Sequence, residues 1–295
     1  MIKIDVCPIC NGREFKPFLT CKDHTVSQET FQLHECVTCS FKITTPRPSE
    51  LGPYYLSDAY ISHSKKAKSI LDRVYITARQ FTLKWKVNLI NSFKTTQKNP
   101  NLLDYGCGTG TFLESSKKSG WNIHGIEPSE IARTQAKATN GPNIHASLSE
   151  LQLTTFDIIT LWHVLEHVEN LNETIESLKR LLSDSGTMFI AVPNHNSWDA
   201  RRYSSTWAAF DVPRHLWHFS QLNMRQLMEK NNLRIIRTKP MKLDAYYVSL
   251  LSEKYTHYKK GFLSRILTAI VNGIKSNGEA KKTSEYSSLI YIIQK

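Results

Sequence analysis

The sequence has 295 residues, of which 40% are hydrophobic and 22% are charged. This composition is ordinary for a folded globular protein, and the length suffices for one large α/β domain with a small additional module. No stretch is long and apolar enough to span a bilayer, and no basic segment followed by an apolar one opens the chain, so we expect a cytoplasmic enzyme. The formal net charge of +12 attracts polyanions, which leaves open nucleic acid, an anionic membrane surface or no specific partner.

Two C-x-x-C pairs stand near the N-terminus, Cys7 with Cys10 and Cys36 with Cys39. Each pair suits a tight turn that aims two thiolates at one tetrahedral ion, and the separation leaves room for a small hairpin, as in zinc ribbons. Disulfides and buried free thiols are the alternatives, but a cytoplasmic setting disfavours disulfides. We therefore expect a structural zinc ion held by these four cysteines, a closed site with no open position for catalysis.

Proline residues at positions 46, 48 and 53 interrupt regular structure and indicate a domain boundary. The predicted organisation is a zinc ribbon over residues 1–45, a linker and capping helix over 46–97, and a main domain over 98–295. Apolar residues recur at helical spacing from about residue 64 to residue 93. This helix either packs on the sheet or, with the tyrosines before it, covers a cofactor.

A glycine-rich turn follows the short apolar run that starts at Leu102. Asp104 ends that run, three glycines then alternate with other residues, and a helical pattern starts at Thr111. The pattern predicts a strand that turns sharply into a helix and lets a ligand lie on the backbone. A second predicted strand ends in Glu127, at the distance usual for a carboxylate that binds the two ribose hydroxyls. An NAD-binding fingerprint spaces its glycines differently.

The compact glycine triplet, with Asp104 before it and the run Gly125-Ile126-Glu127-Pro128-Ser129 after it, resembles the class I S-adenosylmethionine-dependent methyltransferases. The resemblance implies a Rossmann-like, seven-stranded, mostly parallel sheet with helices on both faces. It also implies S-adenosylmethionine as cofactor. The cofactor-binding residues it implies are Asp104, Gly106, Cys107, Gly108, Gly110, Glu127, Pro128, Ser147, Leu148 and His163.

Strands and helices alternate regularly after the glycine turn, which predicts right-handed crossovers and a mainly parallel sheet. A buried-type strand covers 156–162, an amphipathic helix ends before Gly186, and the next strand covers 187–192. Late strands are expected over 233–237 and 289–293, the last one antiparallel. Ligands of such sheets bind at the carboxyl ends of the strands.

Two histidines are candidates for a catalytic base on the acceptor side. His163 follows the 156–162 strand directly and so leaves the sheet at the ligand edge. His215 lies in a loop region, 193–220, that is rich in aromatic residues, histidines and arginines. The alternative role of His163 is a satisfied hydrogen-bonding pair, and that of His215 is a hydrogen bond that closes the loop over the cofactor. A base is required only if the acceptor is a hydroxyl or an acidic C–H.

The whole run resembles a methyltransferase branch that carries a zinc ribbon and occurs in bacterial surface-polysaccharide and secondary-metabolite clusters. This implies O- or C-methylation of a small metabolite, sugar-containing or linked to a lipid or nucleotide, and a role in polysaccharide biosynthesis. The alternative is a zinc-containing rRNA base methyltransferase, so nucleic acid ranks second as a partner. That family mixes cysteine and histidine in its zinc module, and the Asn/Asp-Pro-Pro-Tyr/Phe sequence of many base methyltransferases is missing after residue 162.

An insertion over residues 242–288 contains an apolar helical face from Phe262 to Ile274, flanked by basic residues. A basic amphipathic helix of this kind can lie at a membrane surface. The interpretation we favour is a lid or dimer helix packed on the sheet, with peripheral contact at the inner membrane surface as the alternative. The sequence assigns no oligomeric state.

Overall fold

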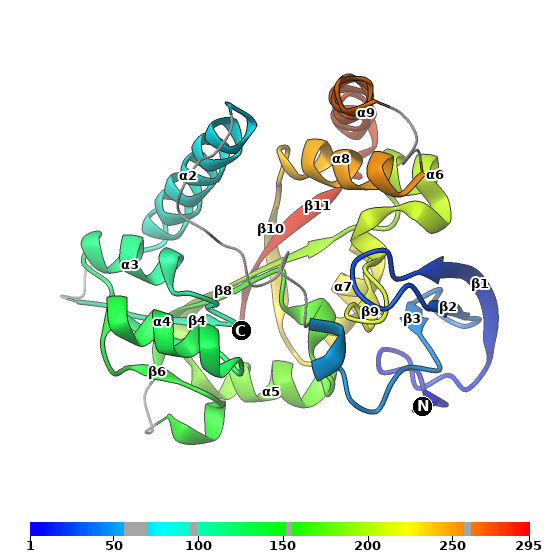
Figure 1. Ribbon diagram of the computed structural model, residues 1–295. Coiled ribbons are helices and arrows are strands. Elements are labelled where there is room, and N and C mark those ends of the chain that lie inside the picture. The colour runs from blue at the N-terminus through cyan, green and yellow to red at the C-terminus, as the bar shows by residue number, and fades with distance from the viewer. Residues whose placement is uncertain (56–69, 95–98, 152–154, 257–260) are drawn as a thin grey trace.

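The computed structural model describes residues 1–55, 70–94, 99–151, 155–256 and 261–295, and for residues 70–79 it describes the backbone only. Two sheets organise the described chain (Figure 1). A seven-stranded sheet forms the main domain, and a four-stranded sheet forms the N-terminal module beside it.

The main sheet confirms the predicted architecture. Its seven strands, in spatial order, are β10 (Arg234–Pro240), β11 (Ser288–Gln294), β8 (Leu182–Pro193), β7 (Phe156–Trp162), β4 (Asn101–Tyr105), β5 (Asn122–Ile126) and β6 (Ile144–His145). Neighbouring strands from β8 to β6 pair in parallel, whereas β11 runs antiparallel to both β8 and β10. The antiparallel last strand is the one that the sequence predicts.

Helices cover both faces of this sheet (Figure 1). The helices of the described chain are α2 (Ile70–Asn91), α3 (Thr111–Lys118), α4 (Glu130–Asn140), α5 (Leu171–Leu181), α6 (Trp198–Tyr203), α7 (Gln221–Lys230), α8 (Asp244–Thr256) and α9 (Phe262–Thr283). Helix α2 falls within the predicted range, and the predicted start of that helix lies outside the described residues.

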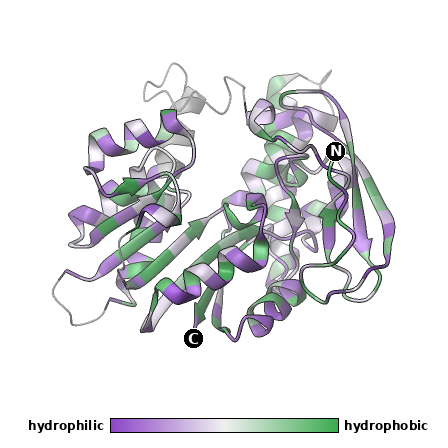
Figure 2. Ribbon diagram, turned by 90° about the horizontal axis from the view of Figure 1, so that it is seen from below, coloured by the Kyte–Doolittle hydropathy of each residue, from purple (hydrophilic) through white to green (hydrophobic). Residues whose placement is uncertain are grey.

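Side chains of the central strands point alternately to the two faces of the sheet, which explains the two layers of helices. Leu103 of β4 faces one core together with Ile175 of α5, whereas its neighbour Leu102 faces a second core with Ile90 of α2. Successive side chains of a strand point to opposite faces, so a strand that is apolar throughout needs cover on both sides. Figure 2 shows these central strands as hydrophobic along most of their length.

The N-terminal module is completed by a strand from the main domain. Its sheet has the order β1 (Phe15–Lys22), β2 (Thr30–Cys36), β3 (Lys42–Thr44) and β9 (Trp217–His218). Strand β9 pairs antiparallel with β3, and the Thr44 hydroxyl donates a 2.7 Å hydrogen bond to the carbonyl of His215. The segment before β9 is therefore held by the N-terminal sheet, an arrangement that no local pattern predicts.

The insertion between β10 and β11 forms α8 and α9, which pack against each other with the apolar face of α9 outward. The exposed fractions of Leu263 and Leu267 are 74% and 65%, whereas Ala269 and Gly273 of α9 are on the packed side. The described chain therefore does not pack this apolar face on the sheet, because small residues let α9 approach α8 on its other face. A dimer helix and contact with a membrane surface both stay predictions. Among the described residues, no helix is long and apolar enough to cross a membrane.

The close approach of α9 to α8 predicts opposite effects of two glycine substitutions in the same helix. A Cβ added at Gly273 would collide with the ring of Tyr246, whose Cγ would lie at 2.8 Å, whereas Gly278 has open space. Gly278→Ala should stabilise the protein by up to about 1 kcal/mol through helix propensity. Gly273→Ala should instead destabilise it by about 1–3 kcal/mol, because the helices must separate. Urea unfolding measures both, and equal stabilisation would contradict the packing described here.

Candidate active site

The glycine turn joins β4 to α3 as the sequence predicts. Gly106, Gly108 and Gly110 all have positive φ angles, of 78°, 55° and 76°. L-residues with side chains rarely adopt this conformation. A Cβ at Gly106 would meet Val164 Cγ1 at 2.8 Å, and one at Gly110 would meet the Ala136 backbone at 3.2 Å, whereas nothing lies within 4 Å of Gly108. The turn is therefore packed on two sides and open at its middle glycine.

Glu127 lies directly beside this turn. It follows β5, and its carboxylate accepts two backbone hydrogen bonds of 2.8 Å, one from Gly108 N and one from Ser129 N. Each carboxylate oxygen keeps a second acceptor position. The backbone N–H of Glu127 also donates to the His145 carbonyl at 2.9 Å, which brings the predicted adenine-side residues Ser147 and Leu148 to the same end of the sheet.

Asp104 is buried under the turn. Its Oδ1 accepts a hydrogen bond of 2.6 Å from the Thr160 hydroxyl, and burial raises the pKa of its carboxyl group to about 7. The Lys86 ammonium of α2 acts in the opposite direction on this pKa. Cys107 is also buried, with its sulfur close to the Cα of Gly125, where a Cβ would lie 2.8 Å away. Both residues therefore support the turn from behind.

His163 lies at the end of β7 with a left-handed backbone, φ 59°. Its Nδ1 is 3.4 Å from Glu166 Oε1, and its Nε2 is 3.1 Å from Asp244 Oδ2 at the start of α8. Burial alone would lower its pKa, but these two carboxylates outweigh burial and raise the pKa to about 9. An imidazolium has no lone pair with which to accept a proton. This geometry favours a protonated, cationic His163, which cannot act as a base.

His215 lies in the buried segment before β9. Its Nδ1 is 2.8 Å from the Ala209 carbonyl oxygen, and its ring packs edge-on against His167, with 4.5 Å between the ring centres. One ligand atom each of Glu166, His167 and His215 lie within 4.8 Å of one another. The two predicted candidates, His163 and His215, are therefore brought to the same place from different segments, with Glu166 between them.

A buried arginine, which the sequence analysis missed as a functional residue, fixes the segment that carries His215. Arg214 is 1% exposed, and it makes two hydrogen bonds to Asp211, of 3.0 and 2.6 Å. Its guanidinium also donates to Asp23 in the turn between β1 and β2, at 2.9 Å, and to the Tyr54 carbonyl at 3.0 Å. The D-x-x-R spacing of residues 211 and 214 is a local signal for the pair of Asp211 with Arg214. Nothing in the sequence indicates that Asp23 also pairs with Arg214.

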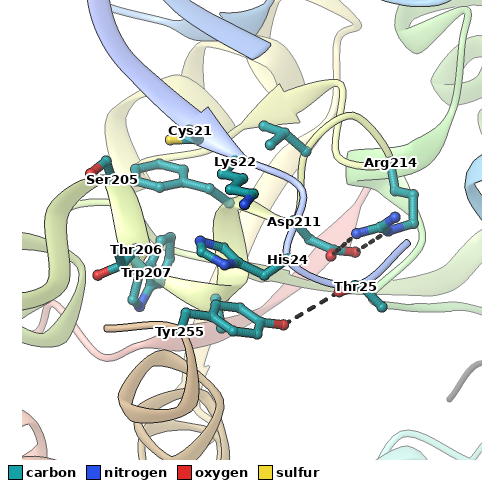
Figure 3. A pocket seen from close by; sticks show the side chains of 13 residues that line it. Cys21, Lys22, His24, Thr25, Ser205, Thr206, Trp207, Asp211, Arg214 and Tyr255 are labelled. Atoms are coloured by element: carbon teal, nitrogen blue, oxygen red, sulfur yellow. Dashed lines mark hydrogen bonds and ion pairs between the residues drawn. The ribbon is translucent and has the colours of Figure 1, made fainter. Parts of the chain in front are cut away.

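Figure 3 shows the junction that this arginine stabilises. A small cavity lies where the β1–β2 turn, the segment around Asp211 and helix α8 meet. The His24 ring stacks on Tyr255 of α8, with 4.4 Å between ring centres, and the Tyr255 hydroxyl is 3.4 Å from that of Thr25. Three parts of the chain that are distant in sequence are therefore in direct contact at one place.

Asp23 gives this junction a dependence on pH that can be measured. Burial opposes ionisation, but hydrogen bonds from Arg214, Ser27 and Thr25 outweigh it and lower the pKa of Asp23 from 3.8 to about 2. A carboxyl group with a depressed pKa adds stability above its unfolded pKa, and this stability is lost as the pH falls through the folded pKa.

The stability difference between wild type and Asp23→Asn should therefore shrink by about 2 kcal/mol between pH 5 and pH 2. Urea unfolding of both proteins at several pH values measures it. A difference that stays constant over this range would show that Asp23 is not ionised against Arg214 in the folded protein.

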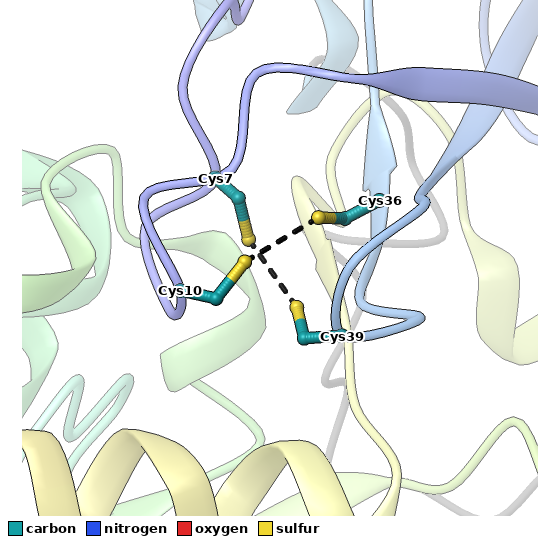
Figure 4. A group of neighbouring side chains, drawn as sticks. All are labelled: Cys7, Cys10, Cys36 and Cys39. Carbon is teal, nitrogen blue, oxygen red and sulfur yellow. Dashed lines mark hydrogen bonds between the residues drawn. The ribbon is translucent and has the colours of Figure 1, made fainter.

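The four cysteines of the N-terminal module converge (Figure 4). Their sulfur atoms all lie within 4.8 Å of one another, with Cys7 Sγ 3.5 Å from Cys39 Sγ and Cys10 Sγ 3.5 Å from Cys36 Sγ. All six cysteines of the chain are free. Four convergent thiols are the donor set that tetrahedral zinc prefers. The residues present therefore fit the predicted metal.

Comparison with known proteins identifies the class of protein that this fold and site define. Residues 77–238 match the methyltransferase domain family, and the chain belongs to that family. The fold is similar to the crystal structure of magnesium protoporphyrin IX methyltransferase from Synechocystis with bound S-adenosylhomocysteine. That match has a TM-score of 0.53 at 14% identity and covers 81% of this chain and 95% of the other. An S-adenosylmethionine-dependent methyltransferase from Archaeoglobus fulgidus matches with a TM-score of 0.50 at 19% identity, over 74% of this chain and 94% of the other. The fold is thus that of the class I S-adenosylmethionine-dependent methyltransferases.

Curated relatives share sequence with only part of the chain. The ubiquinone biosynthesis O-methyltransferase of Rhizobium rhizogenes is 33% identical over 101 residues, which is 32% of this chain and 41% of the relative. The protein of the same name from Haemophilus ducreyi is 35% identical over 107 residues, which is 32% of this chain and 45% of the relative. The chain thus spans less than half the length of these two relatives.

Proposed function

We propose that the chain transfers a methyl group from S-adenosylmethionine to an oxygen atom of a small-molecule acceptor. The observation that carries this proposal is the placement of Glu127 against the Gly108 backbone at the sheet edge where His163, Glu166 and His215 also converge. A donor-binding carboxylate and a polar acceptor cluster at one edge provide both halves of a transfer site. The O-methyltransferase names of the curated relatives support oxygen as the acceptor atom.

On this proposal, the glycine turn binds the methionine end of the cofactor and Glu127 accepts hydrogen bonds from both ribose hydroxyls. Asp104 supports the turn, and Ser147 and Leu148 lie along the adenine, with Pro128 beside them. The sulfonium of the cofactor is already activated, so the protein must align donor and acceptor and exclude water. A hydroxyl acceptor must also lose a proton. The buried cluster of Glu166, His167 and His215 is the place where we propose that this loss is promoted.

The acceptor that we propose is a sugar-containing or lipid- or nucleotide-linked metabolite. Nucleic acid is the alternative, and the formal net charge of +12 favours it. Transfer of a labelled methyl group to a nucleotide sugar, a polyprenyl catechol and rRNA, tested side by side, distinguishes these classes. Labelling of rRNA alone would overturn the small-molecule proposal.

Removal of the Glu127 carboxylate tests the donor site. Glu127→Ala should weaken binding of S-adenosylhomocysteine by at least about tenfold, since a charge-assisted hydrogen bond contributes about 1.5–3 kcal/mol. Glu130→Ala is the matched control, because Glu130 is exposed in the first turn of α4 and its loss changes the net charge equally. Isothermal calorimetry measures both affinities. Equal affinities of the two variants would contradict the assignment of Glu127.

We also propose that Cys7, Cys10, Cys36 and Cys39 bind one structural zinc ion. Cys36→Ser should release zinc and unfold the N-terminal sheet, because binding free energy at such a site is folding free energy. Cys21→Ser is the control, since Cys21 is buried in the same module but outside the cluster. Metal analysis and circular dichroism measure the outcome. Zinc loss in the Cys21 variant, or zinc retention in the Cys36 variant, would disprove this ligand set.

A further inference from the structure

A second group of side chains of metal-ligating types lies in the main domain, apart from the four cysteines. Glu166 and His167 belong to the short 3-10 helix Leu165–His167 at the carboxyl end of β7, and His215 comes from the segment before β9. One ligand atom of each lies within 4.8 Å of the other two. A hydrogen bond of 2.8 Å from Leu216 N to the Glu166 carbonyl holds the two segments together.

Contacts with backbone carbonyls position both imidazole rings. His167 Nδ1 is 3.0 Å from the Arg214 carbonyl oxygen, and His215 Nδ1 is 2.8 Å from that of Ala209. An imidazole whose Nδ1 donates to a carbonyl oxygen presents its Nε2 to a metal. The Tyr55 hydroxyl also lies 3.0 Å from His167 Nδ1. Backbone carbonyls that orient histidines in this way are the usual second layer around metal-binding imidazoles.

Glu166 is the least satisfied polar group of this region. Its side chain is 1% exposed, and neither carboxylate oxygen accepts a hydrogen bond from any described residue. The nearest charged group is His163, at 3.4 Å from Oε1. A buried carboxylate is costly unless it is fully paired or binds a cation. The observed geometry leaves its second oxygen, Oε2, available to a ligand.

We propose that Glu166, His167 and His215 bind a divalent transition metal of the zinc, cobalt, iron or manganese type. Two imidazole nitrogens and one carboxylate oxygen, without sulfur, are typical ligands of such ions in sites that keep a position open. Ligand atoms around a tetrahedral ion lie about 3.4 Å apart. Small rotations of the three side chains are sufficient to reach that separation, since the longest present separation is no more than 4.8 Å.

This inference rests on the proposed function: a metal at this site would position the acceptor hydroxyl for methyl transfer. A metal ion held by Glu166, His167 and His215 would offer an open position to the hydroxyl oxygen and would lower the pKa of that hydroxyl, so that its proton would leave to water. The resulting oxyanion forms the new O–C bond as the methyl–sulfur bond of the cofactor breaks, and S-adenosylhomocysteine leaves. His215 then acts as a metal ligand and does not take up the proton itself. Metal binding by the three residues can be tested without any acceptor.

Titration of the metal-free full chain with Co²⁺ tests the site, because thiolate and imidazole ligands give different spectra. Wild type should bind two Co²⁺ per chain, one with the near-ultraviolet charge-transfer band of thiolates and one with visible bands only. Glu166→Gln and His215→Asn should each retain the thiolate site and weaken the second by at least tenfold. His145→Asn is the matched control, since His145 lies on the edge strand β6.

Two results would overturn the proposal: a wild type that binds one Co²⁺ only, at the thiolates, or a second site that survives in both variants. Cys36→Ser should lose the thiolate band, which assigns that band to the cysteine cluster. Calorimetry with S-adenosylhomocysteine on the same proteins checks the fold of the main domain. It also separates the two proposals, since cofactor binding without a second metal rejects the metal site and leaves the methyltransferase proposal intact.

Discussion

The arrangement of the acceptor side depends on one buried cation. Arg214 is almost completely buried, and transfer of an unpaired guanidinium into such an environment would cost several kcal/mol. Its guanidinium donates to the carboxylate of Asp23 in the β1–β2 turn, to that of Asp211 in its own segment and to the carbonyl of Tyr54. Asp23 in turn accepts hydrogen bonds from the backbone N–H groups of Thr25 and Ser27, so the β1–β2 turn is held by the same carboxylate.

This interaction makes the N-terminal module part of the proposed active site. The cysteine cluster fixes the base of the module, and the Cys39 carbonyl accepts a hydrogen bond of 2.9 Å from Asn223 of α7. Strand β9 attaches β3, and Arg214 attaches the β1–β2 turn, to the segment that carries His215. A metal bound by the cysteines would therefore act on catalysis only through position, by keeping the imidazole of His215 beside Glu166.

The backbone geometry of the proposed donor side could be predicted from the sequence because its signals are local. The glycine turn, Asp104 and Glu127 lie within one strand–helix–strand unit, and their backbone geometry follows from which residues lack a side chain. The acceptor side depends on partners that are distant in sequence. His163 is paired with Asp244, and Arg214 with Asp23, and neither Asp244 nor Asp23 stands in a pattern that marks it. Periodicity likewise showed that α9 has an apolar face, but the small residues on its other face determine which side is packed.

We propose that Glu127 and the glycine turn hold the cofactor with its reactive sulfur directed at the acceptor cluster. A crystal structure of the full chain with S-adenosylhomocysteine tests it most directly. We expect both ribose hydroxyls on the Glu127 carboxylate, and the sulfur atom on the side of the sheet edge where His163 and Glu166 lie. A ligand bound elsewhere, or a ribose held by other residues with the sulfur facing away from this cluster, would contradict it.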